Sequence, residues 1–217
     1  MLGASNSLPP KVLVIGGDSL IGSSLVEHFK SQGTSVGYTS RRPHHKSPAC
    51  IPLELGKSIA PPYIPEVAIL CAGVTDFRSC AEQPDAIRRI NVHAVLELAA
   101  TLHLGGAHIY IFPQMQFVKS RSVQSHSLPP ITTELGAQKY DAERGILALG
   151  ERATVVRATR VVSSRVPMFE GWLTCLVQQS KSFLWSDKYF CPISLRFIAF
   201  WLAKLALRHV SGVFHLS

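Results

Sequence analysis

An apolar run that passes directly into a glycine-containing turn is the feature that most restricts the fold of this chain. Val12–Ile15 is followed by Gly16-Gly17-Asp18-Ser19-Leu20-Ile21-Gly22, and then by a helical pattern that stops at Gly33. A strand, a tight turn and a helix N-terminus in this order are typical of a site that binds a dinucleotide pyrophosphate. The sequence therefore predicts the first βα unit of a nucleotide-binding α/β domain.

Short apolar runs alternate with helical patterns along the first two thirds of the chain, as they do in βαβ units. Helices are expected over about 21–32, 84–104 and 136–147. The expected strands are Val12–Ile15, Ser35–Thr39, Cys50–Leu53, Val67–Cys71, His108–Phe112 and Thr154–Arg157. Because apolar residues make up 47% of the chain and charged residues 17%, these strands should be buried on both faces. We expect a doubly wound, Rossmann-like parallel sheet.

A length of 217 residues allows one large domain with a small appendage. We expect a disordered leader over 1–10, the nucleotide-binding domain over 11–160 and a small C-terminal subdomain over 161–217. That subdomain should contain helices over about 169–179 and 195–208 and strands over 183–185 and 212–216, and should pack against the carboxyl ends of the parallel strands. The segment 114–134 has no periodicity, and a loop of this length is usually functional or mobile.

Composition argues against several other classes of protein. The five cysteines form no Cys-x-x-Cys pair, so neither a disulfide framework nor a zinc site is expected. This pattern favours a location in the reducing cytoplasm. His44-His45 lack partners at ligand spacing, and no metal is expected. The net charge of +8 is dispersed, which does not favour a nucleic-acid partner. The apolar stretch 198–207 is too short for a membrane span.

The glycine turn and the end of the second strand together predict a cofactor. Gly16-x-x-Ser19-x-x-Gly22 keeps the outer glycines of the usual motif, and the serine hydroxyl can bond a phosphate although its Cβ takes up space. Alternatively, the glycines serve only a tight turn and close packing. Basic side chains follow the second strand where an NAD-binding domain has an acidic residue, which favours NADP(H). The expected contacts are Gly16, Asp18, Ser19, Leu20, Ile21, Gly22, Arg41 and Arg42.

Further segments carry a resemblance to a known family. They are Cys71-Ala72-Gly73-Val74-Thr75, Arg89-Ile90-Asn91-Val92, Lys139-x-x-x-Glu143, Pro192-Ile193-Ser194 and Ser211-Gly212-Val213-Phe214-His215-Leu216. With the glycine turn, they resemble the extended short-chain dehydrogenase/reductase superfamily, most closely its branch of dTDP-4-dehydrorhamnose reductases and related sugar-nucleotide enzymes. The resemblance extends over nearly the whole chain from Lys11 onward.

The resemblance implies a Rossmann-like domain with a small substrate-binding subdomain, a nicotinamide dinucleotide and a nucleotide-sugar ligand. Further contacts with the cofactor are implied for Cys71, Ala72, Gly73 and Lys139. Lys139 would be a remnant that binds the nicotinamide ribose, or else a solvated lysine. Contacts with the substrate are implied for Thr75, Gln114, Arg157 and Arg160. The two arginines could equally form a surface pair.

The same resemblance exposes gaps in the catalytic machinery. Members of the family polarise the substrate carbonyl with a Ser or Thr and protonate it with the Tyr of a Tyr-x-x-x-Lys pair. Here Phe112 and Pro113 lie at the hydroxyl positions and Leu135 lies at the tyrosine position. Loss of a placed acid forfeits about 10²–10⁴ in rate. Tyr140, in a Tyr-x-x-x-Arg sequence, is an alternative donor if the helix register shifts.

Three functions remain open at this point. The chain is a nucleotide-binding regulatory or structural subunit with impaired chemistry, a divergent NADP-dependent reductase or epimerase, or a scaffold with a vestigial nucleotide site. The first two predict a bound dinucleotide and a nucleotide-sugar ligand. A homo- or hetero-oligomer fits each of them.

Overall fold

A seven-stranded parallel sheet runs through the protein, with the strand order β3-β2-β1-β4-β5-β6-β9. The computed structural model describes residues 11–42, 47–57, 61–113, 131, 133–163, 167–180 and 192–216. The strands are β1 (Val12–Ile15), β2 (Val36–Ser40), β3 (Cys50–Pro52), β4 (Val67–Leu70), β5 (His108–Ile111), β6 (Ala153–Ala158) and β9 (Gly212–Leu216). The predicted doubly wound Rossmann-like fold is confirmed.

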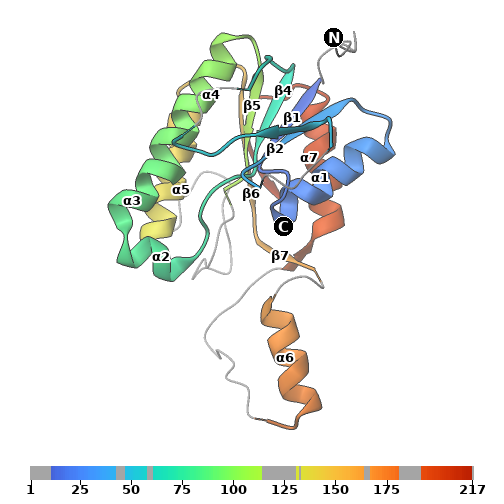
Figure 1. Cartoon of the computed structure of the whole chain (residues 1–217), viewed down its shortest axis with the longest axis vertical. Coiled ribbons are helices and arrows are strands. Elements are labelled where there is room, and N and C mark those ends of the chain that lie inside the picture. Colours follow the sequence, from blue (N-terminus) through green and yellow to red (C-terminus); the bar gives the residue numbers. More distant parts are fainter. Residues whose placement is uncertain are drawn as a thin grey trace, which may run out of the picture.

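Helices cover both faces of the sheet (Figure 1). One face carries α1 (Leu20–Ser31) and α7 (Leu195–Ala206), which pack against each other. The other carries α2 (Phe77–Glu82), α3 (Pro84–Arg88), the π-helix η1 (Arg89–Ala94), α4 (Val95–Leu104) and α5 (Glu134–Leu147). Strand residues alternate between the two layers, so Val12 and Val14 join one core cluster and Leu13 and Ile15 the other.

The helix expected over 84–104 is divided, because η1 interrupts it. A π-helical turn has i→i+5 hydrogen bonds, is rare, and is frequent at functional sites. Its register presents Asn91 to the loop after β4, where the amide side chain bonds the backbone of Val74. Helix α2, which lies in that loop, has no counterpart among the expected elements.

The C-terminal third departs from the expectation of a separate subdomain over 161–217. Strand β9 pairs in parallel with β6 and completes the main sheet, and α7 supplies the helix that connects back to it. These elements are the final βα unit of the large domain, because α7 buries Ile198, Leu202 and Ala206 in its core and β9 adds an edge strand to its sheet. A second sheet contains β7 (Arg160–Val162) and β8 (Pro192–Ser194), and helix α6 (Pro167–Val177) lies away from the main sheet (Figure 1).

Several expectations fall outside the described residues. They are the leader 1–10, the pair His44-His45, the strand 183–185 and the 114–134 loop apart from residues 131, 133 and 134. Elsewhere, the expected helices and strands differ from the observed ones by one or two residues at most of their ends, as with α5, which begins at Glu134 rather than at Gly136.

Candidate functional site

The candidate site lies at the carboxyl ends of β1 and β4. These strands are neighbours, but the chain leaves β1 toward α1 on one face and leaves β4 toward α2 to α4 on the other. Such a switch point opens a crevice between the two connections, and ligands of doubly wound sheets bind there. The glycine turn and the loop after β4 therefore form the two sides of the site.

The first and last glycines of the turn are required by close packing. A Cβ at Gly16 would lie 2.8 Å from the backbone of Ala72, and Gly16 has φ +84°. A Cβ at Gly22 would lie 2.2 Å from the carbonyl oxygen of Gly16. The turn thus holds β1, β4 and α1 together tightly and places the N-terminus of α1, where the first amides of a helix have no intrahelical partner, at the carboxyl edge of the sheet.

Ser19 begins helix α1 as its N-cap. Its hydroxyl accepts a hydrogen bond from the Gly22 N–H at 3.1 Å, and its own N–H donates to the Gly16 carbonyl at 3.0 Å. As an acceptor in the cap, the hydroxyl still has a proton to donate to an anion. Leu20 and Ile21 follow as the first two residues of the helix, at the positive end of its dipole.

The end of β2 is fixed to this turn. Thr39 accepts from the Gly16 N–H at its Oγ1, at 2.9 Å, and from the Gly17 N–H at its carbonyl, at 2.8 Å. The next residues, Arg41 and Arg42, are exposed, and Arg42 Nε lies 3.6 Å from Asp18 Oδ2. The predicted arginines are therefore beside the phosphate turn.

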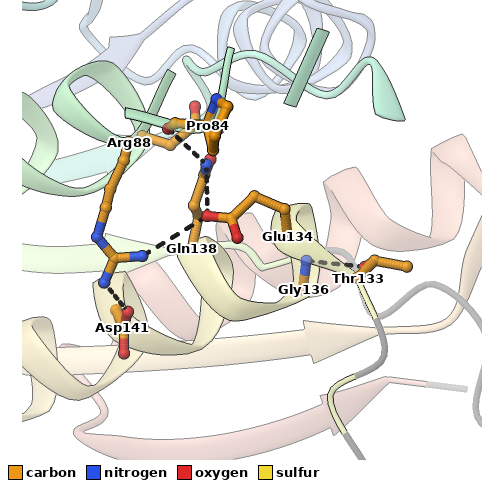
Figure 2. A network of polar contacts seen from close by, with 8 residues as sticks. Pro84, Arg88, Thr133, Glu134, Gly136, Gln138 and Asp141 are labelled. Atoms are coloured by element: carbon orange, nitrogen blue, oxygen red, sulfur yellow. Dashed lines mark hydrogen bonds and ion pairs between the residues drawn. The ribbon is translucent and has the colours of Figure 1, made fainter. Parts of the chain in front are cut away.

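A buried amide network holds the loop after β4. Asn91 accepts from the Val74 N–H at 2.8 Å, donates to the Val74 carbonyl at 2.9 Å and donates to Gln138 Oε1 at 2.9 Å. Gln138 in turn donates to the Pro84 carbonyl at 3.3 Å and to Glu134 Oε1 at 3.1 Å (Figure 2). This network joins α5 to η1 and fixes the backbone of the loop at Val74.

The amine of Lys139 faces the same loop. A Cβ at Gly73 would lie 3.3 Å from Lys139 Nζ and 3.0 Å from Asn91 Oδ1. Burial lowers the pKa of Lys139, with Cys80 and Cys71 acting weakly in the opposite direction. Burial also raises the pKa of the Cys71 thiol to about 12. Across the described part of the chain no carboxylate lies within ion-pair distance of Lys139, so its ammonium protons are available to a ligand.

The positions predicted from the family resemblance to correspond to the proton donor and the carbonyl-binding hydroxyls are apolar and enclosed. Leu135 is one turn before Lys139 on α5 and is buried, as are Phe112 and Pro113 after β5. Tyr140 lies about 100° further around the helix than Lys139. Its ring contacts the guanidinium of Arg144 at 5.8 Å, so the pair lies on another side of α5.

The predicted substrate contacts lie in different environments. Arg157 is buried and forms an ion pair with Glu143, from Nε to Oε2 at 3.0 Å and Oε1 at 3.1 Å and through a further contact from Nη2. This corrects the expectation of a substrate contact, because the Arg157 side chain is only 9% exposed and its guanidinium is already paired with Glu143 inside the core. Arg160 is half-buried in β7, Thr75 is exposed, and Gln114 is outside the described residues.

Sequence reasoning missed Asn91 and Gln138 as positioning residues. Asn91 lies in the motif that carried the family resemblance, and it interrupts an otherwise apolar helical pattern, which is the signal that was available. No cluster of three or more metal-binding side chains occurs within the described ranges. Among the described helices, none is long and apolar enough to cross a membrane.

The model of one protein family, described as the RmlD substrate binding domain, matches residues 10–217. The chain belongs to this family. Its predicted resemblance to dTDP-4-dehydrorhamnose reductases within the extended short-chain dehydrogenase/reductases is thereby confirmed. Comparison with curated proteins finds no significant match.

Solved structures show the same fold at low sequence identity. A hypothetical dTDP-4-dehydrorhamnose reductase from Sulfolobus tokodaii is 17% identical with a TM-score of 0.79, over 95% of this chain and 76% of its own. The Bacillus anthracis dTDP-4-dehydrorhamnose reductase, solved with NADP, is 17% identical with a TM-score of 0.74, over 98% of this chain and 76% of its own. The Bordetella bronchiseptica enzyme WbmG, solved with NAD, is 18% identical with a TM-score of 0.77, over 98% of this chain and 74% of its own.

Proposed function

We propose that this chain binds NADP(H) as a member of the family that has lost the usual Ser/Thr and Tyr catalytic groups, and that it acts as a regulatory or structural subunit. The observation that carries the proposal is the contrast between a tightly built phosphate turn at Gly16–Gly22 and the apolar, buried Leu135 beside Lys139. The turn supports cofactor binding. An aliphatic side chain cannot protonate an alkoxide.

The fit of a nicotinamide dinucleotide rests on this chain's own groups. The cradle at Gly16 and Gly22, which a Cβ would fill, suits the pyrophosphate, and Arg41 and Arg42 suit an adenosine 2′-phosphate. Lys139 suits the hydroxyls of the nicotinamide ribose because its amine is not engaged by a carboxylate among the described residues. When bound, the nicotinamide supplies hydride.

The remaining parts of the proposal concern location and partners. Cys50, Cys71, Cys80 and Cys175 are free, which supports the reducing environment of the cytoplasm. A nucleotide sugar is the proposed second ligand, since the named relatives include dTDP-sugar enzymes. Homo- or hetero-oligomerisation would give a subunit without turnover a means to act.

The test combines binding with turnover. Titration of the purified chain with NADPH, followed by fluorescence, should show saturation. Incubation of the complex with several 4-keto sugar nucleotides should then leave the NADPH absorbance unchanged. Failure to saturate would contradict the proposal and leave the scaffold with a vestigial site, whereas consumption of NADPH would contradict the loss of chemistry.

A divergent but active reductase or epimerase is the second candidate. It is favoured by one observation, the retention of Lys139 against the loop that Asn91 fixes. In that case Tyr140 is the nearest phenol in sequence to the usual donor, and Tyr140→Phe should abolish NADPH consumption. Tyr63→Phe is the matched control because the buried Tyr63 hydroxyl has no hydrogen-bond partner among the described residues.

A further inference from the structure

A carboxylate, that of Asp18, lies inside the phosphate turn, although its negative charge should repel an anionic ligand there. The side chain of Asp18 is only 17% exposed, and its ion-pair partner is Arg42, which is 69% exposed and comes from the end of β2. The Asp18 Oδ2 and Arg42 Nε atoms are 3.6 Å apart. The backbone N–H of Arg42 donates to Ser40 Oγ at 3.0 Å, which fixes where the arginine leaves the strand.

The two elements that carry this pair are held rigidly together. Both amides at the start of the turn, Gly16 N–H and Gly17 N–H, bond to Thr39 on β2 at 2.9 and 2.8 Å. In doubly wound domains the end of this strand receives the adenosine ribose. Asp18 and Arg42 therefore converge on the part of a dinucleotide at which NAD and NADP differ.

The chemistry of the two side chains favours opposite ligands. A carboxylate accepts hydrogen bonds from free ribose hydroxyls, but it repels a 2′-phosphate, which carries about −1.5 to −2 charge like other phosphate monoesters. A guanidinium binds the phosphate by charge-assisted hydrogen bonds and gains much less from a hydroxyl. While Asp18 holds Arg42, a phosphorylated ligand must compete with the carboxylate for the same cation.

We infer that Asp18 is a specificity-determining residue. From its position in the glycine turn, it performs the role that an acidic residue at the end of β2 has in NAD-binding domains. It stabilises the unphosphorylated ribose and opposes the 2′-phosphate, whereas Arg42 does the reverse, so the chain accepts both NAD(H) and NADP(H). This inference rests on the proposed binding of a dinucleotide at the turn.

The test uses ADP-ribose and 2′-phospho-ADP-ribose, which differ only in the phosphate and lack the nicotinamide. Isothermal titration of the full-length chain gives the ratio of the two dissociation constants. Asp18→Asn should change this ratio about tenfold in favour of the phosphorylated ligand, and Arg42→Ala should change it about tenfold in favour of ADP-ribose. Asp18→Glu keeps the charge and should keep the direction of preference shown by the unaltered chain.

Glu66→Gln is the matched control. It removes one negative charge at the amino end of β4, whereas the phosphate turn lies at the carboxyl ends of the strands, so the ratio should not change. Circular dichroism melting checks that each variant folds. If Asp18→Asn binds both ligands but leaves the ratio unchanged, or moves it toward ADP-ribose, the inference is overturned while nucleotide binding stands. If the unaltered chain binds neither ligand, the proposed function itself fails, and the inference with it.

Discussion

Removing one partner of the Arg157–Glu143 pair should destabilise the fold severely. In Glu143→Ala the guanidinium of Arg157 stays in a position that is 9% exposed but loses a carboxylate that accepts from its Nε at both oxygens and from its Nη2. Breaking a buried pair in this way costs about 3–5 kcal/mol. For a chain of this size the melting temperature should fall by about 6–20 °C.

Urea unfolding followed by far-ultraviolet circular dichroism measures this loss. Arg157→Ala should cost a similar amount, because it leaves the Glu143 carboxylate buried and unpaired. The double variant Glu143→Leu with Arg157→Leu should recover most of the loss, since neither charge then remains inside. A loss under about 1 kcal/mol in either single variant would refute a buried pair and return Arg157 to the substrate site.

Three other outcomes are expected. Burial lowers the pKa of His108 to about 4, so between pH 6.5 and 4 the unfolded chain binds a proton at this residue and the folded chain does not. The free energy of unfolding should therefore fall by about 2 kcal/mol from pH 7 to 5. In urea titrations, His108→Phe should reduce this dependence on pH. Gly22→Ala should abolish saturable NADPH binding because its Cβ meets the Gly16 carbonyl, whereas Gly171→Ala, in open space, should not. Asn91→Ala should lower stability by about 2–3 kcal/mol in the same titrations and increase amide hydrogen exchange in the loop after β4.

The sheet and the phosphate turn could be predicted from the sequence because local patterns determine them. Val12–Ile15 is apolar at every position, as a strand buried on both faces requires, and the glycines that follow allow the close approaches seen at Gly16 and Gly22. The carboxyl edge of a parallel sheet is then the expected place for a ligand. Fold class and candidate cofactor contacts follow from these two facts.

The errors arose where contacts link residues distant in sequence. Nothing local to Arg157 shows that it will meet Glu143 from the preceding helix, and a basic residue after a strand fits a ligand contact equally well. Asn91, in the π-helical turn, bonds the backbone of Val74, 17 residues earlier. Likewise β9 joins the sheet through its pairing with β6, whereas its sequence fits a strand of a small subdomain equally well.

We propose that this chain keeps a cofactor site beside Leu135, an apolar residue at the position that the family resemblance assigns to the proton donor. The most direct measurement compares the rate of NADPH oxidation with a 4-keto sugar nucleotide in the unaltered chain and in the variant Leu135→Tyr with Pro113→Thr. We expect no measurable rate in the unaltered chain and a gain of about 10²-fold or more above background in the variant. Turnover by the unaltered chain at the variant's rate would contradict this proposal.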